Sequence, residues 1–220
     1  MSTANALAPG KKILIVDDDR LVLSTVADGL TRAGYQVTRA ESAEEAEAWL
    51  AGGQRPDLAI LDVRLSGQNG LYLAQRLREL DRIPFMMFSA YSDPHIVEQA
   101  TRCGALAYAV KPQGIPQLVP AIEAALARAN ELEDLRELRQ QLQQALDNER
   151  SISVATGILM MEYRLKRSDA FALLRDNARQ QRRKLADMAD TVVGARETLN
   201  LDMAQAPRSQ TPLTRLTTTL

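Results

Sequence analysis

The 220-residue chain has little cysteine, few aromatic residues and no long apolar run, and each shortage excludes a class of protein. Cys103 is the single cysteine, so no disulfide can form within the chain, which suits a reducing compartment. Aromatic residues make up 4%, so aliphatic side chains must fill the core. No stretch reaches the roughly 18 apolar residues of a membrane-spanning helix, and the first ten residues lack the regions of a secretion signal. We therefore expect a cytoplasmic protein.

Charge is nearly balanced over the whole chain but unevenly distributed along it. The formal net charge of −1 indicates no partner by itself. Residues 130–149, however, carry a balance of −4, and residues 150–200 a balance of +4. A basic module behind an acidic spacer is consistent with a polyanionic partner, although a charge of this size is weak evidence alone.

Short apolar runs alternate with helical patterns over the first 120 residues. The run KILIV at 12–16 is rich in β-branched residues, which is typical of a strand buried on both faces of a parallel sheet. Further strands are expected at 36–40, 58–62, 85–89 and 107–111, and helices at 21–33, 42–51, 71–80 and 95–103. These five units predict an α/β fold with a doubly wound parallel sheet.

Residues 117–150 predict one long helix, because the middle of this stretch contains no glycine or proline. Four apolar residues fit the a and d positions of barely two heptads: Leu135, Leu138, Leu142 and Ala145. A short coiled coil is the favoured interpretation, and a single helix packed on its own domain is the alternative.

Residues 150–200 predict three further helices, the second of them capped by Ser168. A unit of about fifty residues buries little surface alone, so packing in a dimer would stabilise it. Residues 201–220 hold two prolines and many threonines without a periodic apolar face, which predicts a disordered tail.

Five polar residues fall at the carboxyl ends of the expected strands: Asp17, Asp18, Asp62, Ser89 and Lys111. Parallel strands bring these ends together, and three crowded carboxylates repel one another unless a cation lies between them. Oxygen ligands of this kind suit Mg²⁺. A carboxylate here can act as nucleophile toward a phosphoryl donor, while the lysine and the serine stabilise charge on the phosphoryl oxygens.

The segments that carry these residues resemble the receiver domain of two-component response regulators. They read ILIVDDDRLVL, LAILDVRLSGQNGL, FMMFSAY and GALAYAVKP, and the resemblance covers residues 11–129. It implies a flavodoxin-like sheet of five strands, phosphorylation of Asp62 by a sensor histidine kinase, and Mg²⁺ bound by Asp17, Asp18 and Asp62.

The same resemblance implies roles for three more residues. Ser89 and Lys111 contact the phosphoryl group, Tyr108 is the switch aromatic, and the Lys111-Pro112 peptide bond is cis. The chain departs from the family at Ser66, where a proline is usual.

Three further segments, ATGILM, DAFALLRDNA and RKLADMADTVV, resemble the ANTAR domain, the RNA-binding module of transcription antitermination regulators. We assign residues 150–200 to this domain and 130–149 to a coiled-coil linker. The resemblance implies binding to paired hairpins in leader RNA, and we expect a homodimer promoted by phosphorylation. The expected RNA-binding residues are Arg175, Arg179, Arg182, Arg183 and Lys184. A solvated helix face is the alternative for these residues.

Three other functions remain open from the sequence. A DNA-binding response regulator is one, although no helix-turn-helix pattern with a tight glycine turn is present. A phosphatase that forms an aspartyl-phosphate is another, but it would commonly place an acid two residues after the nucleophile, where this chain has Arg64. The third is a protein-interaction receiver with a helical dimerisation tail. We favour a regulator that is not an enzyme.

Overall fold

Residues 10–66 and 69–205 are described by the structure, a computed structural model, which divides into the units Met1–Arg136 and Glu137–Leu220. The division falls inside the helix α5 (Ile115–Tyr163), so this helix contributes residues to both units. None of the helices in the described ranges is long and apolar enough to cross a membrane.

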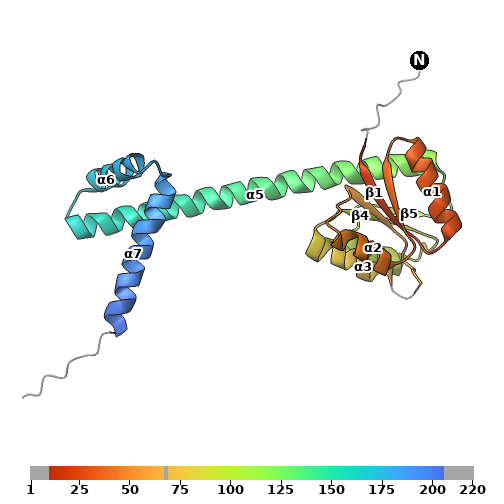
Figure 1. Cartoon of the computed structure of the whole chain (residues 1–220), viewed down its shortest axis with the longest axis horizontal. Helices are drawn as coiled ribbons and strands as arrows, with labels where there is room; N and C mark the ends of the chain where they lie inside the picture. The colour runs from red at the N-terminus through yellow and green to blue at the C-terminus, as the bar shows by residue number, and fades with distance from the viewer. Residues whose placement is uncertain (1–9, 67–68, 206–220) are drawn as a thin grey trace, which may run out of the picture. The chain divides into compact units, whose positions relative to one another are not determined.

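The first unit is built on a five-stranded parallel sheet (Figure 1). Its strands are β1 (Lys12–Val16), β2 (Gln36–Ala40), β3 (Leu58–Leu61), β4 (Phe85–Ser89) and β5 (Tyr108–Val110). They lie in the order β2-β1-β3-β4-β5, and all four pairings are parallel. The order reverses between β1 and β3, which is where doubly wound sheets bind ligands beyond the carboxyl ends of the strands. The predicted flavodoxin-like fold is confirmed.

Helices connect the strands and cover both faces of the sheet. They are α1 (Arg20–Arg32), α2 (Ala43–Ala51), α3 (Gly70–Arg76), α4 (Pro94–Cys103) and the start of α5. The helix predicted at 71–80 is divided, since α3 is followed directly by a π-helical turn, η1 (Leu77–Asp81).

Alternate residues of the strands enter two separate cores, which explains the continuous apolar runs in the sequence. In β1, Leu14 and Val16 belong to the core shared with α2, α3 and α4. Ile13 and Ile15 belong to the core shared with α1 and α5. The buried Tyr35, between α1 and β2, donates a hydrogen bond to Glu123 of α5 and thereby ties α5 to this second core.

The second unit contains the C-terminal part of α5, with α6 (Arg167–Gln180) and α7 (Leu185–Gln205) (Figure 1). Its core consists of residues from all three helices: Ala155, Leu174, Ala178, Met188 and Ala189. Ile152, Leu159, Leu185 and Val192 pack partly buried against it. The expected small three-helix domain is therefore present.

Two boundaries in this unit differ from the prediction. The long helix and the first helix of the C-terminal domain are one continuous helix, α5, because a lone Gly157 costs only about 1 kcal/mol in a helix interior. Ser168 is not the cap of α6: Lys166 occupies that position without a side-chain hydrogen bond, and Ser168 lies in the first turn. The tail was predicted from residue 201, whereas α7 continues to Gln205, and residues 206–220 lie outside the described ranges.

Candidate functional site

The carboxyl ends of β1, β3, β4 and β5 bring four of the predicted site residues together. The ladder of the sheet continues one residue past three of these strands, which fixes the backbone of each residue. The amide of Asp17 donates to the carbonyl of Ala40, and the amide of Asp62 donates to the carbonyl of Val16. The amide of Lys111 donates to the carbonyl of Ser89, 2.9 Å away. Loops separated by up to 94 positions in sequence therefore meet at one edge.

Lys111 is the cation of this cluster. Its Nζ lies 2.6 Å from Oδ2 of Asp17 and 2.7 Å from Oδ2 of Asp62, and only 11% of its side chain is exposed. Burial acts to lower the pKa of Lys111, but the two carboxylates outweigh it, and the pKa is raised above its ordinary value. The lysine is therefore held as an ammonium ion against both carboxylates.

Ser89 and Asp17 complete the buried part of the cluster. The Ser89 hydroxyl donates to Oδ1 of Asp62 at 2.6 Å, so each oxygen of Asp62 has a donor. Burial raises the pKa of Asp17, although its hydrogen bond and its attraction to Lys111 act in the opposite direction.

Asp18 forms the exposed rim of an acidic group. Carboxylate oxygens of Asp17, Asp18 and Asp62 all lie within 4.8 Å of one another. This set of close oxygens fits a hard divalent cation such as Mg²⁺. The Ser66 hydroxyl donates to Oδ2 of Asp18 at 2.6 Å, from the loop that follows Asp62. Asp19 takes no part, because its carboxylate accepts from the first amides of α1 and caps that helix.

Aromatic and basic side chains flank the acidic group. The guanidinium of Arg64 lies 4.3 Å from the centre of the Tyr91 ring, a cation–π contact. The Tyr108 hydroxyl donates to the carbonyl of Tyr91, and the Lys111-Pro112 peptide bond is cis. Gly70 packs so tightly on this loop that a Cβ there would lie 1.8 Å from the carbonyl oxygen of Asp62.

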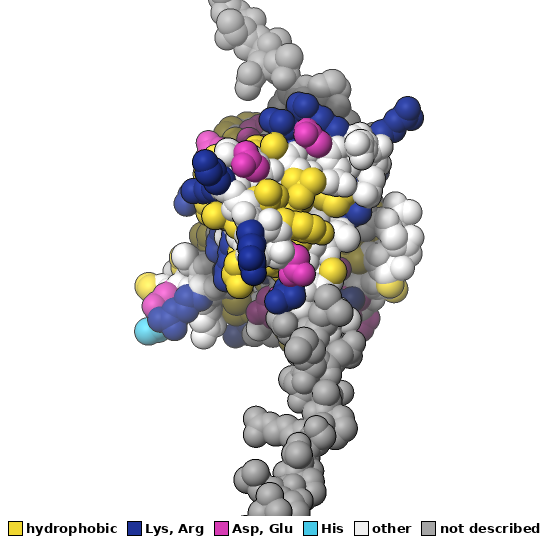
Figure 2. All heavy atoms as spheres, turned by 90° about the vertical axis from the view of Figure 1, so that its left-hand side faces the viewer, with side chains coloured by type: hydrophobic (Ala, Val, Ile, Leu, Met, Phe, Trp, Pro, Cys, Tyr) yellow, Lys and Arg dark blue, Asp and Glu magenta, His cyan; other side chains and the backbone are white. Residues whose placement is uncertain are grey.

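The five basic residues predicted to bind RNA do not share one helix. Arg175 and Arg179 lie on α6, one turn apart, whereas residues 182–184 form the connection to α7. Arg175 pairs with the neighbouring Asp176 at 3.3 Å. Arg183 donates to Thr191 and to the carbonyl of Asp187 on α7, so its guanidinium is already engaged. Figure 2, which faces the second unit, shows Lys and Arg side chains around a group of hydrophobic ones.

Two protein-family models match the chain. The response regulator receiver domain matches residues 13–123, and the ANTAR domain matches residues 140–193. The chain belongs to the response regulators with an ANTAR domain. This architecture is that of a two-component transcription regulator, in agreement with the prediction.

One relative of this response regulator matches most of the chain, and another matches about half of it. It is 30% identical to the transcriptional regulatory protein PdtaR of Mycobacterium tuberculosis over 190 residues, which are 86% of this chain and 92% of that protein. It is 36% identical to the phosphate regulon transcriptional regulatory protein PhoB of Pseudomonas aeruginosa over 122 residues, 54% of this chain and 53% of that protein.

Solved structures agree with the fold of the first unit. A CheY-like receiver domain protein from Methanospirillum hungatei is similar, with a TM-score of 0.51 and 28% identity over 55% of this chain and 97% of that chain. The N-terminal domain of a three-domain response regulator from Carboxydothermus hydrogenoformans has a TM-score of 0.51 and 32% identity over 56% of this chain and 98% of that chain.

Sequence reasoning missed two features of the site in this response regulator. The Ser66–Asp18 hydrogen bond was not predicted, and its only signal was the departure from the usual proline. The packing of Gly70 on the Asp62 backbone was also missed, because a close approach between neighbouring loops leaves no periodic pattern.

Proposed function

We propose that this response regulator accepts a phosphoryl group on Asp62 from a sensor histidine kinase and controls transcription antitermination through its ANTAR domain. Phosphorylation of Asp62 is supported by the contact of the Lys111 ammonium with two carboxylates. One ammonium bridges Asp17 and Asp62 while Ser89 donates to the other oxygen of Asp62. A buried carboxylate with both oxygens held by donors is oriented for attack at a fixed position.

The residues of the cluster divide the chemistry between them. An oxygen of Asp62 forms a bond to phosphorus while the bond from phosphorus to the donor's leaving group breaks. Lys111 and Ser89 then donate to the phosphoryl oxygens rather than to the free carboxylate. Asp17, Asp18 and Asp62 would hold Mg²⁺, which neutralises charge on the phosphoryl group when bound.

A hydrolytic cycle is disfavoured by the same geometry. An enzyme that hydrolyses its aspartyl-phosphate needs a general acid beside the nucleophile. The side chain two residues after Asp62 is Arg64, which lies over the ring of Tyr91. We therefore propose a regulator in which the phosphoryl group is a signal and not a catalytic intermediate.

Labelling with a small phosphodonor tests this assignment. Acetyl phosphate with Mg²⁺ should add a single phosphoryl group to the wild-type protein, detected by intact mass, and Asp62→Asn should remain unlabelled. Asp57→Asn is a matched control, because Asp57 pairs with Lys11 at the other end of β3 and should leave labelling intact. Labelling of Asp62→Asn at the wild-type level would refute the assignment.

A homodimer would couple phosphorylation of Asp62 to RNA binding by the ANTAR domain. The apolar seam of α5 has no cover within the described residues, since Leu135, Leu138 and Leu142 are 62%, 53% and 58% exposed. In a parallel pairing, Asp134 of one copy faces Arg139 of the other, which are opposite charges at g and e positions. Two linked ANTAR domains would bind a two-hairpin RNA more tightly than one, through effective concentration alone.

RNA titrations test the output. Phosphorylated protein should bind a two-hairpin leader RNA more tightly than unphosphorylated protein at fixed salt, and deletion of one hairpin should remove that gain. Arg179→Ala should weaken binding modestly and reduce the salt slope by about one, with Asp62 labelling unchanged. Equal binding to duplex DNA would instead support a DNA-binding regulator, and no binding to either would support a protein-interaction output.

A further inference from the structure

Four helices of this protein end in the same backbone motif, but with different residues in it. One residue after the helix adopts a left-handed conformation, and the next amide donates back to the carbonyl five residues earlier. Glycine takes the left-handed position after α1 and α4, as Gly34 and Gly104. Arginine takes it after α5 and α6, where Arg164 and Arg182 both have a φ of 53°. Glycine adopts this conformation without steric cost, whereas arginine does not.

The charge of the turn distinguishes these two arginines from a third one. Arg82, which follows η1, has the same φ of 53°, but the residue before it is Asp81. The arginines of the second unit instead begin basic turns, RLKR at 164–167 and RRK at 182–184. A costly backbone conformation that twice places basic side chains together points to a use for their charge beyond folding.

The exposed cations of the first turn have no anionic partner in the described part of the second unit. Arg164 and Lys166 are exposed, and they belong to none of the ion pairs found there. The last acid of α5, Glu162, is already paired with Arg196 of α7 at 3.3 Å. Asp169 is therefore the one acid left beside three basic residues, and the turn keeps a positive charge.

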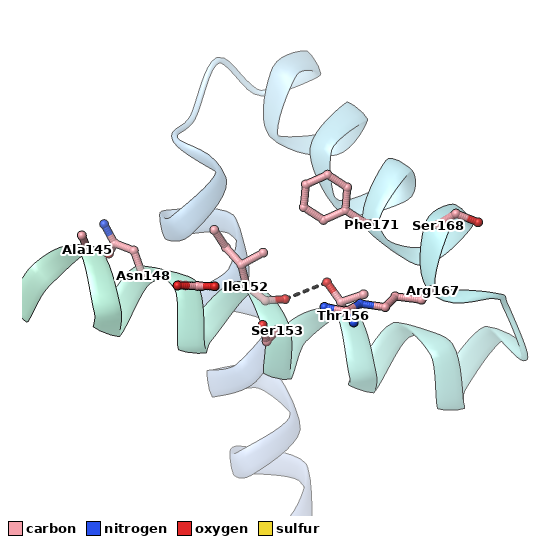
Figure 3. A pocket seen from close by; sticks show the side chains of 9 residues that line it. Ala145, Asn148, Ile152, Ser153, Thr156, Arg167, Ser168 and Phe171 are labelled. Carbon is pink, nitrogen blue, oxygen red and sulfur yellow. Dashed lines mark hydrogen bonds between the residues drawn. The ribbon is translucent and has the colours of Figure 1, made fainter.

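Arg167, the third basic residue of this turn, points into the second unit (Figure 3). It lines a groove of about 770 Å³ between α5 and α6, together with Glu149 of α5. The ring of Phe171 lies over the same groove. Neither Arg164 nor Lys166 lines it, so these two residues are the cations of the turn that lie outside the groove.

An exposed aromatic residue beside the turn favours RNA as the anionic partner. Tyr163, the last residue of α5, is 61% exposed and directly precedes Arg164. Aromatic rings stack on unpaired bases, while basic side chains contact the phosphates next to them. An acidic protein surface would make no comparable use of the ring.

We infer that the turn between α5 and α6 is a second RNA contact, in which Arg164 and Lys166 bind phosphates and Tyr163 stacks on a base. The inference rests on the proposed RNA output and adds a site to the one expected at residues 182–184. The two turns lie at opposite ends of α6, whose 14 residues extend over about 21 Å. They would therefore contact different phosphates of one hairpin, and two separate contacts fix its orientation on the domain.

Lysine acetylation of the full-length protein tests the location of this contact. The protein is treated with an acetylating reagent in the presence and absence of the two-hairpin leader RNA, and each lysine is quantified by mass spectrometry. RNA should remove most of the modification of Lys166 and of Lys184, whereas Lys12 in β1 is the control and should be modified as before.

The outcomes separate this inference from the proposed function. Protection of Lys184 without protection of Lys166 would overturn the second contact while the RNA output stands. Protection of neither lysine would overturn both. Protection of Lys166 by vesicles of anionic lipid, but not by RNA, would identify a membrane surface as the partner and would also overturn the inference.

Glycine substitution separates RNA binding from folding. Arg164→Gly keeps the left-handed turn and removes one charge, so the urea midpoint of unfolding should not fall. The RNA dissociation constant should nevertheless rise about fivefold, and the salt slope should fall by about one. Arg82→Gly is the matched control, because Arg82 has the same φ and should leave RNA affinity unchanged. Wild-type affinity of Arg164→Gly for RNA, with or without a change in unfolding, would overturn the inference.

A pair of substitutions at Tyr163 tests the stacking. Tyr163→Phe keeps the ring and should bind RNA like the wild-type protein, whereas Tyr163→Ala should bind about tenfold more weakly. Leu173→Ala is the control for the loss of an exposed apolar side chain, since Leu173 is 36% exposed on α6. Equal losses for Tyr163→Ala and Leu173→Ala would overturn the role of the ring in the contact.

Discussion

Removal of the Ser66 hydroxyl should weaken Mg²⁺ binding without unfolding the first unit. Ser66 stands where the family usually has proline, and its Oγ donates to Oδ2 of Asp18 at 2.6 Å. This is the one hydrogen bond of the Asp18 carboxylate among the described residues. A carboxylate oxygen of Asp18 lies within 4.8 Å of oxygens of Asp17 and Asp62, so the hydroxyl orients a residue of the acidic group that would hold the metal.

The size of the effect follows from the exposure of this pair. A hydrogen bond to a charged group contributes about 1.5–3 kcal/mol when buried. Asp18 and Ser66 are both exposed, and water replaces the hydroxyl in the variant, so we take about 1 kcal/mol as the cost of losing the orientation. That corresponds to roughly a fivefold weaker affinity, which is smaller than the roughly 10–100-fold losses typical of outer-shell partners because this pair is exposed to water.

Calorimetric titration with Mg²⁺ alone measures this effect directly. Ser66→Ala should bind about fivefold more weakly than wild type, and Ser66→Thr, which keeps the hydroxyl, should bind like wild type. Urea unfolding of all three proteins without Mg²⁺ should give equal free energies. Tighter binding by Ser66→Ala would refute the reasoning, because it would mean that the hydroxyl competes with the metal for Asp18.

Three other substitutions test packing and titration, two in the first unit and one in the second. Gly70→Ala should destabilise it by about 3 kcal/mol or more in urea unfolding, because the new Cβ would meet the carbonyl oxygen of Asp62. Gly157→Ala, with no atom within 4 Å of its Cβ, should instead be neutral or stabilising by up to about 1 kcal/mol. Burial and the hydrogen bond to Glu123 raise the pKa of Tyr35, so the folded state holds this proton more tightly than the unfolded state. The resulting stability is complete below pH 10 and declines above it by up to about 1.4 kcal/mol per pH unit; Tyr35→Phe should lack that decline, and equal pH profiles would contradict it.

The layout of the first unit was predictable from local patterns. Continuous apolar runs at 12–16 and 85–89 predict strands buried on both faces, and the structure assigns their alternate residues to two cores. The grouping of Asp17, Asp62 and Lys111 was predictable as well, because parallel strands of similar length end at one edge. Both inferences depend on the order and direction of the strands, and neither depends on the positions of individual side chains.

Contacts between loops were not predictable in the same way. The Ser66 hydroxyl reaches Asp18 across 48 positions of sequence, and nothing in either segment indicates the other. The end of α6 shows a similar limit, since Arg182 has the helical spacing of Arg175 and Arg179 but lies in the connection to α7. Helical spacing in the sequence shows which residues would share a face if the helix continued. It does not predict the residue at which tertiary packing ends the helix.

The amino-acid sequence by itself determined which segments of the first unit are strands and helices, which carboxylates meet, and that α5 has an apolar seam. Each of these depends on interactions within a segment or on the common direction of parallel strands. The tertiary structure alone decided that α5 continues to Tyr163 and that Phe171 lies over a groove beside it. That groove exists because α6 returns along α5 after a three-residue turn, and the angle of such a return depends on side chains from both helices at once.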